Sequence, residues 1–190
     1  QTFTDCPEDG MSYLAGYLFQ TKMINGVPYI ADRHLDGELM ERLIRYLPEG
    51  AMFRATVTTD GVKTWSIKCP SVKSQHMHNG IGIITREFGY IDQKIMERNL
   101  PDDKYCNAEF VRGLVDFCGN VYGGDVNFAF SEHCQNEIAK VLDKIGLTYT
   151  TQKQELLIHN FPSALAHKSD KVQILRQWEE GMAGSFNLRN

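Results

Sequence analysis

Two side chains able to take part in a reaction lie close together in an otherwise apolar stretch. Asp116 and Cys118 occupy the end of residues 110–121, most of which are apolar. A carboxylate can bind a hard divalent cation, and a thiolate is a nucleophile. No histidine accompanies Cys118 in the sequence, so a buried structural thiol is the commoner state. For Asp116, hydrogen bonding at a helix end is favoured over metal binding.

Histidines and the remaining cysteines provide weaker candidates for metal sites. His76 and His78 are separated by one residue, a spacing that can bind zinc on a strand, but no third ligand is near in sequence. Surface histidines are the preferred interpretation. The five cysteines are scattered without a C-x-x-C pair, so neither a zinc ribbon nor a disulfide framework is predicted. Free thiols indicate a reducing, intracellular (cytoplasmic) compartment.

The apolar stretch that carries Asp116 predicts a buried helix, and an earlier segment repeats it. Residues 12–20 are also apolar, with Gly16 at the position that Gly113 has in the later segment. With these glycines in register, the chain divides into halves at 1–104 and 105–190. The sequence therefore predicts an internal repeat of two domains joined through two buried helices.

The segments that follow each apolar helix predict the same order of elements. In the first half, Asn-Gly at 25–26 predicts a hairpin over 22–33. Apolar residues at helical spacing predict a helix over 36–47, and alternating residues predict a second hairpin over 51–69. Further helices are predicted over 72–85 and 90–100.

The second half begins with a helix over 105–118, followed by two strands that turn at Gly123 and Gly124. Val126, Phe128 and Phe130 are predicted to form the apolar face of the second strand. The later predicted elements are a helix over 134–147, strands over 148–153 and 155–159, a short helix from residue 162 and a helix over 170–182. The predicted fold class is α+β, with two pseudo-symmetric αββαββα repeats and antiparallel sheets.

This repeat resembles the LAGLIDADG homing endonuclease family in its single-chain, two-repeat form. Leu-Ala-Gly at 14–16 matches the start of the first motif, and Val-Arg-Gly-Leu-Val-Asp-Phe-Cys-Gly at 111–119 matches most of the second. The resemblance covers nearly the whole chain. It implies that the motif helices pack side by side, and that two four-stranded sheets form a saddle over double-stranded DNA. The helix-pair interface is then expected to include Leu14, Ala15, Gly16, Gly113 and Leu114.

The resemblance also implies a divalent-metal site at the carboxyl ends, or feet, of the motif helices. The chain departs from the family pattern there, because the two metal-ligand positions are Thr21 and Cys118, and Lys22 replaces the glycine after the first. Neither residue offers the anionic oxygen that Mg²⁺ prefers. Asp116 stands at an earlier acidic position and is the one catalytic candidate. No cofactor is therefore expected, and Mg²⁺ is expected only if nuclease activity is retained.

Few basic residues are available for a nucleic-acid interface. Arg54, Thr56 and Lys68 share the solvated face of the hairpin over 51–69. Lys168 and Lys171 lie close to where the resemblance implies a basic residue facing the scissile phosphate, although a solvated helix start explains both equally well. The formal net charge of −4 argues against a strong DNA binder, because phosphate neutralisation supplies most of the affinity for duplex DNA.

Three functions remain open from the sequence. The first is a catalytically inactive LAGLIDADG-like module that binds nucleic acid or a protein on its sheets. The second is an active endonuclease with altered ligands, in which Asp116 acts with Asp125 or Glu132, both placed on strands. The third is a protein–protein adaptor or inhibitor, which the acidic charge favours over the second. The chain is expected to be a monomer by internal pseudo-dimerisation, without a membrane span, and the resemblance suggests a phage or mobile-element origin.

Overall fold

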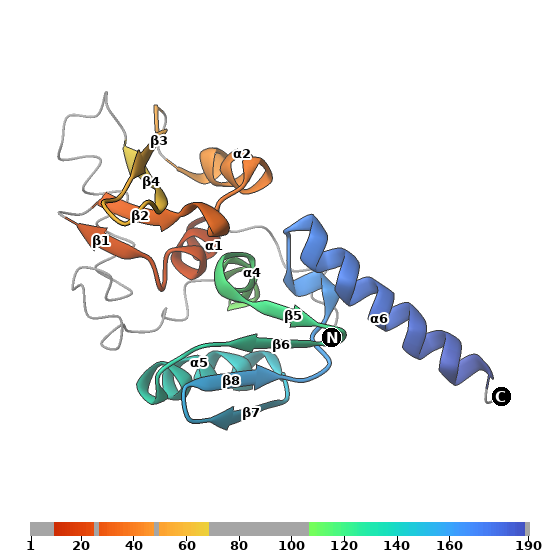
Figure 1. Cartoon of the computed structure of the whole chain (residues 1–190). Coiled ribbons are helices and arrows are strands. Elements are labelled where there is room, and N and C mark those ends of the chain that lie inside the picture. The colour runs from red at the N-terminus through yellow and green to blue at the C-terminus, as the bar shows by residue number, and fades with distance from the viewer. Residues whose placement is uncertain (1–9, 25–26, 48–49, 69–106, 189–190) are drawn as a thin grey trace.

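Two buried helices occupy the centre of the molecule, with an antiparallel sheet on either side (Figure 1). The computed structural model describes residues 10–24, 27–47, 50–68 and 107–188, and the structural statements below concern these residues. The central helices are α1 (Gly10–Tyr17) and α4 (Asn107–Cys118). The fold is α+β. The helices predicted over 72–85 and 90–100 and the His76–His78 pair lie outside the described residues.

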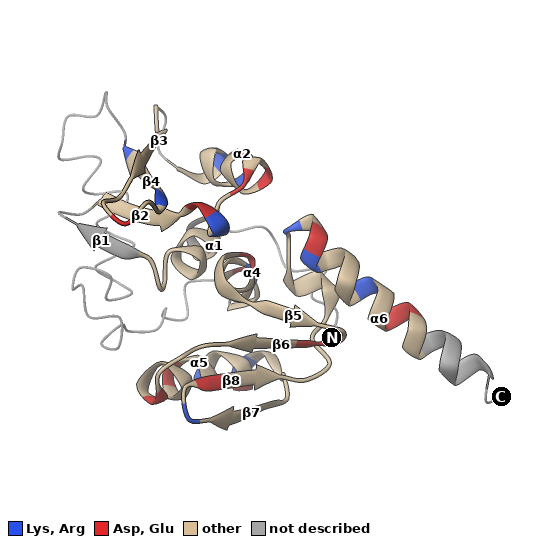
Figure 2. Ribbon diagram, in the orientation of Figure 1, with Lys and Arg blue, Asp and Glu red and all other residues tan. Residues whose placement is uncertain are grey.

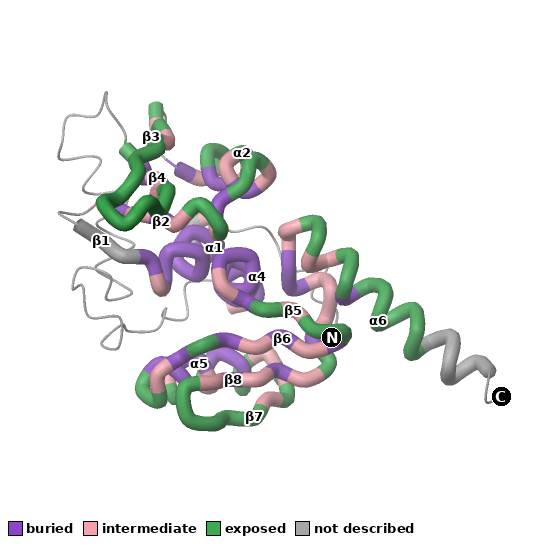
Figure 3. Tube along the Cα trace, viewed as in Figure 1, coloured by how far each residue is buried: buried purple, intermediate pink, exposed green. Residues whose placement is uncertain are grey.

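Helices α1 and α4 approach each other closely because a glycine of each faces the backbone of the other. A Cβ atom added at Gly16 would lie 1.9 Å from the backbone oxygen of Phe110, and one added at Gly113 would lie 2.1 Å from that of Tyr13. Figure 3 shows both helices buried over most of their length. Such helices gain stability from burial of their whole surface rather than from one apolar face. Of the residues expected at this interface, Leu14, Ala15 and Leu114 are also buried.

The first sheet has the strand order β1-β2-β4-β3. Its strands are β1 (Lys22–Ile24), β2 (Val27–Ala31), β3 (Met52–Val57) and β4 (Lys63–Lys68). Ile30 pairs with Trp65, so Ile30 and Ile67 share the face that is buried. Between β2 and β3 lie the short 3-10 helix η2 (Asp32–His34) and helix α2 (Gly37–Tyr46), whose first turn is capped by the Asp36 side chain.

The second sheet has the matching order β5-β6-β8-β7. Its strands are β5 (Asn120–Tyr122), β6 (Asp125–Phe128), β7 (Tyr149–Gln152) and β8 (Glu155–Ile158). Val126, Phe128, Leu156 and Ile158 are buried on one face of it. Helix α5 (Glu132–Ile145) connects β6 to β7 and ends at Gly146, whose φ of 77° is the left-handed conformation that glycine adopts readily.

Two predictions in this half were wrong in detail. Phe130 is buried but lies beyond the end of β6, so it does not extend the apolar face of that strand. Glu132 was placed on a strand, yet it is the first residue of α5. The cause is Ser131, whose side chain accepts a hydrogen bond from the backbone N–H of Cys134 and starts the helix there.

The chain ends in the 3-10 helix η4 (Ser163–Leu165) and the long helix α6 (Ser169–Leu188), which projects away from the body (Figure 1). Leu175 anchors its first turns in the core. Trp178 lies over the β5–β6 turn, where a Cβ atom added at Gly124 would be 2.0 Å from the indole nitrogen. Within the described part of the chain, no helix combines the length and apolar character that crossing a bilayer requires.

Candidate functional site at the feet of the central helices

The feet of α1 and α4 open into one cavity because both helices end on the same side of the molecule. The cavity has a volume of about 510 Å³. Gln20 and Thr21 line it after α1, and Cys118 and Asn120 line it at the end of α4. The fold therefore brings together Thr21 and Cys118, the two positions at which the family resemblance implies metal ligands.

The donors in this cavity do not fit a hard divalent cation. Its charged or titratable lining groups are Arg33, His34, the Tyr29 phenol and the Cys118 thiol, and among the described residues no carboxylate lines it. Magnesium and calcium need several oxygen ligands, usually including carboxylates. Elsewhere among the described residues, too, no group of three or more His, Cys, Asp or Glu side chains is arranged to hold a metal ion.

Asp116 lies beside the cavity but is directed into the protein. It is only 1% exposed, and its Oδ2 accepts a hydrogen bond from the Tyr13 hydroxyl at 2.5 Å. Its Oδ1 accepts from the backbone N–H groups of His167 and Lys168 at 3.0 and 2.9 Å. Burial raises the pKa of the Asp116 carboxyl, and these three donors oppose that rise. The side chain thus joins α1, α4 and the segment before α6.

The Cys118 thiol is also poorly suited to act as a nucleophile or as a metal ligand. Its Sγ donates to the backbone oxygen of Leu114 at 3.5 Å, a contact within its own helix. Burial raises the pKa of the Cys118 thiol to about 12, although the nearby Lys171 ammonium acts in the opposite direction. Because the thiolate is the nucleophile and the metal ligand, a thiol with this pKa is inert at neutral pH.

His34 forms the wall of the cavity between the two helices. Its backbone oxygen accepts from the Tyr17 hydroxyl at 2.5 Å, and its ring stacks on Phe117 with the centroids 4.6 Å apart. Nε of Arg33 donates to Nε2 of His34 at 3.1 Å. Burial lowers the pKa of His34, and the cationic charges of Arg33, Lys171 and Lys168 lower it further. Sequence reasoning missed Arg33 and His34, whose one signal is that they lie at the end of the first predicted hairpin, Arg33 as its last residue and His34 directly after it.

The two lysines proposed for phosphate contact are bound to protein groups. Nζ of Lys171 donates to the backbone oxygens of Val115 and Asp116 at 2.6 and 3.2 Å, which caps the carboxyl end of α4. Burial lowers the pKa of Lys171. Nζ of Lys168 lies 3.6 Å from Asp36 and 3.5 Å from Asp170. Neither lysine lines the cavity.

The proposed interface residues of the first sheet lie apart from the cavity. Arg54 and Thr56 pair with Ser66 and Thr64, and Lys68 follows on the same face of β4. All three proposed residues are exposed, on the face opposite Ile30 and Ile67. None of them lines the cavity at the helix feet. They form a surface separate from the cavity.

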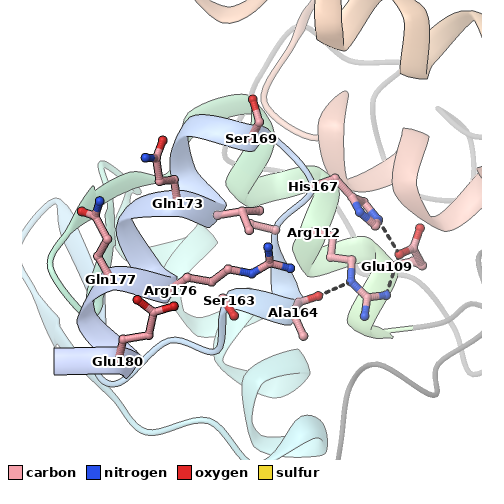
Figure 4. Close-up of a pocket in the computed structure, with 12 residues that line it drawn as sticks. Glu109, Arg112, Ser163, Ala164, His167, Ser169, Gln173, Arg176, Gln177 and Glu180 are labelled. Carbon is pink, nitrogen blue, oxygen red and sulfur yellow. Dashed lines mark hydrogen bonds and ion pairs between the residues drawn. The ribbon is translucent and has the colours of Figure 1, made fainter. Parts of the chain in front are cut away.

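A buried ionic network holds the segment before α6 against α4 (Figure 4). Arg112 donates through Nη1 to Oε1 of Glu109 at 2.6 Å and through Nε to the Ala164 oxygen at 2.6 Å. Nε2 of His167 lies 3.0 Å from the same Glu109 oxygen. Burial acts to raise the pKa of Glu109, but His167 and Arg112 hold it below its ordinary value. This network borders a second cavity of about 750 Å³ and positions the backbone donors of Asp116.

Comparison with known proteins adds a distant structural similarity. No protein-family model and no curated protein matches the chain. The crystal structure of I-DmoI in complex with DNA and Ca has 12% identity and a TM-score of 0.46, over 93% of this chain and 90% of that chain. Mesophilic variants of the homing endonuclease I-DmoI have 11% identity and a TM-score of 0.45, over 88% and 96%. These values are too low to assign an activity, a ligand or a residue role to this chain.

Proposed function

We propose that this chain is a LAGLIDADG-like protein that binds nucleic acid and has lost metal-dependent cleavage. The observation that carries the proposal is the donor set of the cavity at the helix feet. Both halves contribute to that cavity, which is the arrangement a shared reaction centre requires, yet arginine, histidine and uncharged groups line it. A site of this composition can bind a phosphate but lacks the ligands for a divalent cation.

The loss of cleavage follows from what metal-assisted phosphodiester hydrolysis needs. Carboxylates must converge on the scissile phosphate to hold the ions that activate water and stabilise the leaving oxygen. Asp116 is the nearest acid to the helix feet by sequence, and both of its oxygens accept hydrogen bonds from protein groups. Recruiting it as a ligand would leave the Tyr13 hydroxyl and two backbone N–H groups without their acceptor, at a cost of about 1–3 kcal/mol for each buried group.

Binding would use the outer faces of the two sheets. Arg54 and Lys68 are exposed on the first sheet and can neutralise backbone phosphates. The corresponding face of the second sheet carries Asn120, Asn127 and Gln152, whose amides suit contacts to base edges. One chain carries both faces, so a monomer would suffice for a double-stranded target.

The test has two arms. In the first, binding to a pool of random duplex DNA is measured in EDTA from low to moderate salt. We expect affinity at low salt that falls steeply as salt rises. In the second, the same DNA is incubated with a molar excess of protein and Mg²⁺ or Mn²⁺, and we expect no new ends. Metal-dependent cleavage would contradict the loss of activity, and absence of binding at low salt would contradict the nucleic-acid function.

A protein-binding role is the second candidate, and the composition of the second sheet favours it. Strands β5 to β8 contain no lysine or arginine, and their charged residues are Asp125 and Glu155 (Figure 2). Tyr122, on the same sheet, is 76% exposed. A polar, acidic face with an exposed aromatic residue suits a protein partner better than a polyanion. Failure to bind DNA at low salt would favour this role.

A further inference from the structure

Among the described residues, Arg33 is the one charged side chain that lines the cavity at the helix feet without a role in the packing of the central helices. It belongs to η2, which follows β2 directly. Its Nε donates to His34, which leaves the N–H groups of the two terminal nitrogens for another acceptor. Among the described residues, no carboxylate forms an ion pair with Arg33.

His34 holds Arg33 in a defined orientation. Arginine can only donate, so Nε2 of His34 must accept the bond from Arg33 and the ring proton must be on Nδ1. The ring cannot turn freely, because it stacks on Phe117. The backbone of the same residue is fixed by the Tyr17 hydroxyl. Burial and the Arg33 charge lower the pKa of His34, a backbone hydrogen bond to Phe117 opposes them in part, and the net lowering favours the neutral ring.

The other polar groups of the cavity complement an anion. Gln20, Tyr29 and Asn120 line it with amide and hydroxyl donors, and in the part of the chain that the structure describes no acid lines it to repel a phosphate. A guanidinium whose Nε is already fixed loses less conformational entropy on binding and matches two phosphate oxygens with its fork. The arrangement thus has the features of a preorganised phosphate site.

We propose that this cavity binds a phosphate group of the nucleic-acid backbone directly through the Arg33 guanidinium, which His34 orients as a positioning residue. Nucleic acid as the source of the phosphate rests on the proposed function, whereas the anion site itself does not. Arg33 would then supply, in the cavity at the helix feet, the positive charge that a bridging cation would otherwise supply to the nucleic-acid backbone. Binding at the helix feet would anchor the centre of a duplex lying across both sheets.

The first experiment measures the salt dependence of duplex DNA binding for variants of full-length protein. Removing one phosphate contact reduces the slope of log K against log salt by about 0.9. We expect that reduction for Arg33→Gln and a smaller one for Arg33→Lys, which keeps the charge but not the fork. Arg45→Gln is the matched control, because Arg45 is an exposed arginine of α2 outside the cavity. Equal slopes for Arg33→Gln and Arg45→Gln would overturn the proposal.

Variants of His34 separate orientation from packing. His34→Phe keeps a ring to stack on Phe117 but has no acceptor for Arg33, whereas His34→Gln offers an amide oxygen near the place of Nε2. We expect the phenylalanine variant to lose DNA affinity by about threefold to tenfold, as is typical for one polar contact of about 1 kcal/mol. We expect the glutamine variant to recover most of that loss. Equal affinity of His34→Phe and the unmodified protein would show that His34 does not position Arg33.

A second experiment uses inorganic phosphate and no DNA. We expect phosphate to shift the NMR signal of the Arg33 Nε–H in the unmodified protein, with the His34 nitrogens showing a proton on Nδ1. If DNA does not bind but phosphate shifts Arg33, the anion site stands and the nucleic-acid function fails. If DNA binds while phosphate leaves Arg33 unchanged and Arg33→Gln has no effect on the slope, the nucleic-acid function stands and the anion site fails.

Discussion

The two sheets share one strand order but expose different chemistry. The outer face of the first carries Arg54 and Lys68, whereas the strands of the second contain no basic residue and carry Asp125 and Glu155. In the interior the two helices are alike, because Gly16 and Gly113 each contact the backbone of the other helix. A close backbone contact constrains both helices at once, whereas solvent-exposed faces can change independently. The helix contact therefore constrains both sides of the molecule together, whereas the outer faces of the two sheets can differ.

The feet of the two helices differ in a similar way. Near the end of α4, Asp116 is bound by groups from α1 and from the segment before α6. The foot of α1 has Thr21 instead, and the link from α1 to Asp116 is the hydrogen bond from the Tyr13 hydroxyl. Asp116 therefore makes a structural contact near the foot of α4, where the foot of α1 has a hydroxyl side chain.

The close contact between α1 and α4 is tested by substituting the glycine that each helix contributes to it. We expect Gly16→Ala and Gly113→Ala each to lower the free energy of unfolding by about 3–5 kcal/mol, because the new Cβ atom would overlap a backbone oxygen that cannot move alone. Gly37→Ala is the control, since no atom lies within 4 Å of its added Cβ. Denaturant titration measures all three. Tolerance of one helix alanine but not the other would show that the contact is one-sided.

The burial of the α4 foot is tested by thiol reactivity. Since the pKa of Cys118 is raised from 9.0 to about 12, its thiolate fraction at pH 8 is about a thousandfold lower than in the unfolded chain. We expect alkylation to be slower by a similar factor, measured by mass spectrometry of the peptide that contains Cys118. The raised pKa also means that this thiol stabilises the fold below pH 9, and that its contribution is lost as the pH rises toward 12. Equal alkylation rates of Cys118 in the folded and the denatured protein would contradict the burial of this thiol.

The one-sided role of Asp116 is tested by a graded series. We expect Asp116→Ala to cost about 2–4 kcal/mol of unfolding free energy, because it leaves three donors without an acceptor. Tyr13→Phe removes one of the three bonds and is expected to cost about 1 kcal/mol. Asp116→Asn keeps an oxygen for the two backbone donors. Its cost in unfolding free energy is expected to lie between those of Asp116→Ala and Tyr13→Phe. If Asp116→Ala costs no more than Tyr13→Phe, the contact with the segment before α6 adds nothing to stability.

The difference in charge between the outer faces of the two sheets is expected to change the salt dependence of DNA binding only slightly. We expect Arg54→Gln and Lys68→Gln each to reduce the slope of log K against log salt for DNA binding by no more than about 0.9. Asn127→Ala, on the second sheet, is expected to leave the slope unchanged, because an amide displaces no counterion. Equal slopes for the variants of both sheets would show that the charge difference does not direct binding.

Local sequence patterns predicted most of the elements, because periodicity and capping act within a few residues. The helix expected over 36–47 is α2 (Gly37–Tyr46), and that expected over 134–147 is α5 (Glu132–Ile145), shifted because the Ser131 cap was not recognised. Phe130 continues the alternation of β6 without belonging to it. A side chain can remain buried after its strand has ended, and alternation alone cannot detect that end.

The site was less accessible to sequence reasoning because its contacts join distant segments. A hydrogen-bonded helix end was the favoured interpretation of Asp116, but its partners Tyr13, His167 and Lys168 follow from the packing of three elements. Lys171 was considered for phosphate contact, and its ammonium caps α4. Arg33 and His34 match no motif. The role proposed for them depends on η2 lying beside the foot of α4, a placement that no local pattern records.

The hydrogen bond between Tyr13 and Asp116 spans 103 residues, and this separation has a consequence for folding kinetics. Helix α1 is synthesised about a hundred residues before the helix that buries its glycine face. Proteins dominated by such distant contacts fold slowly, since the loop must close before the contact forms. Until then α1 is an uncovered apolar helix. The early half is accordingly expected to depend on chaperone protection during synthesis.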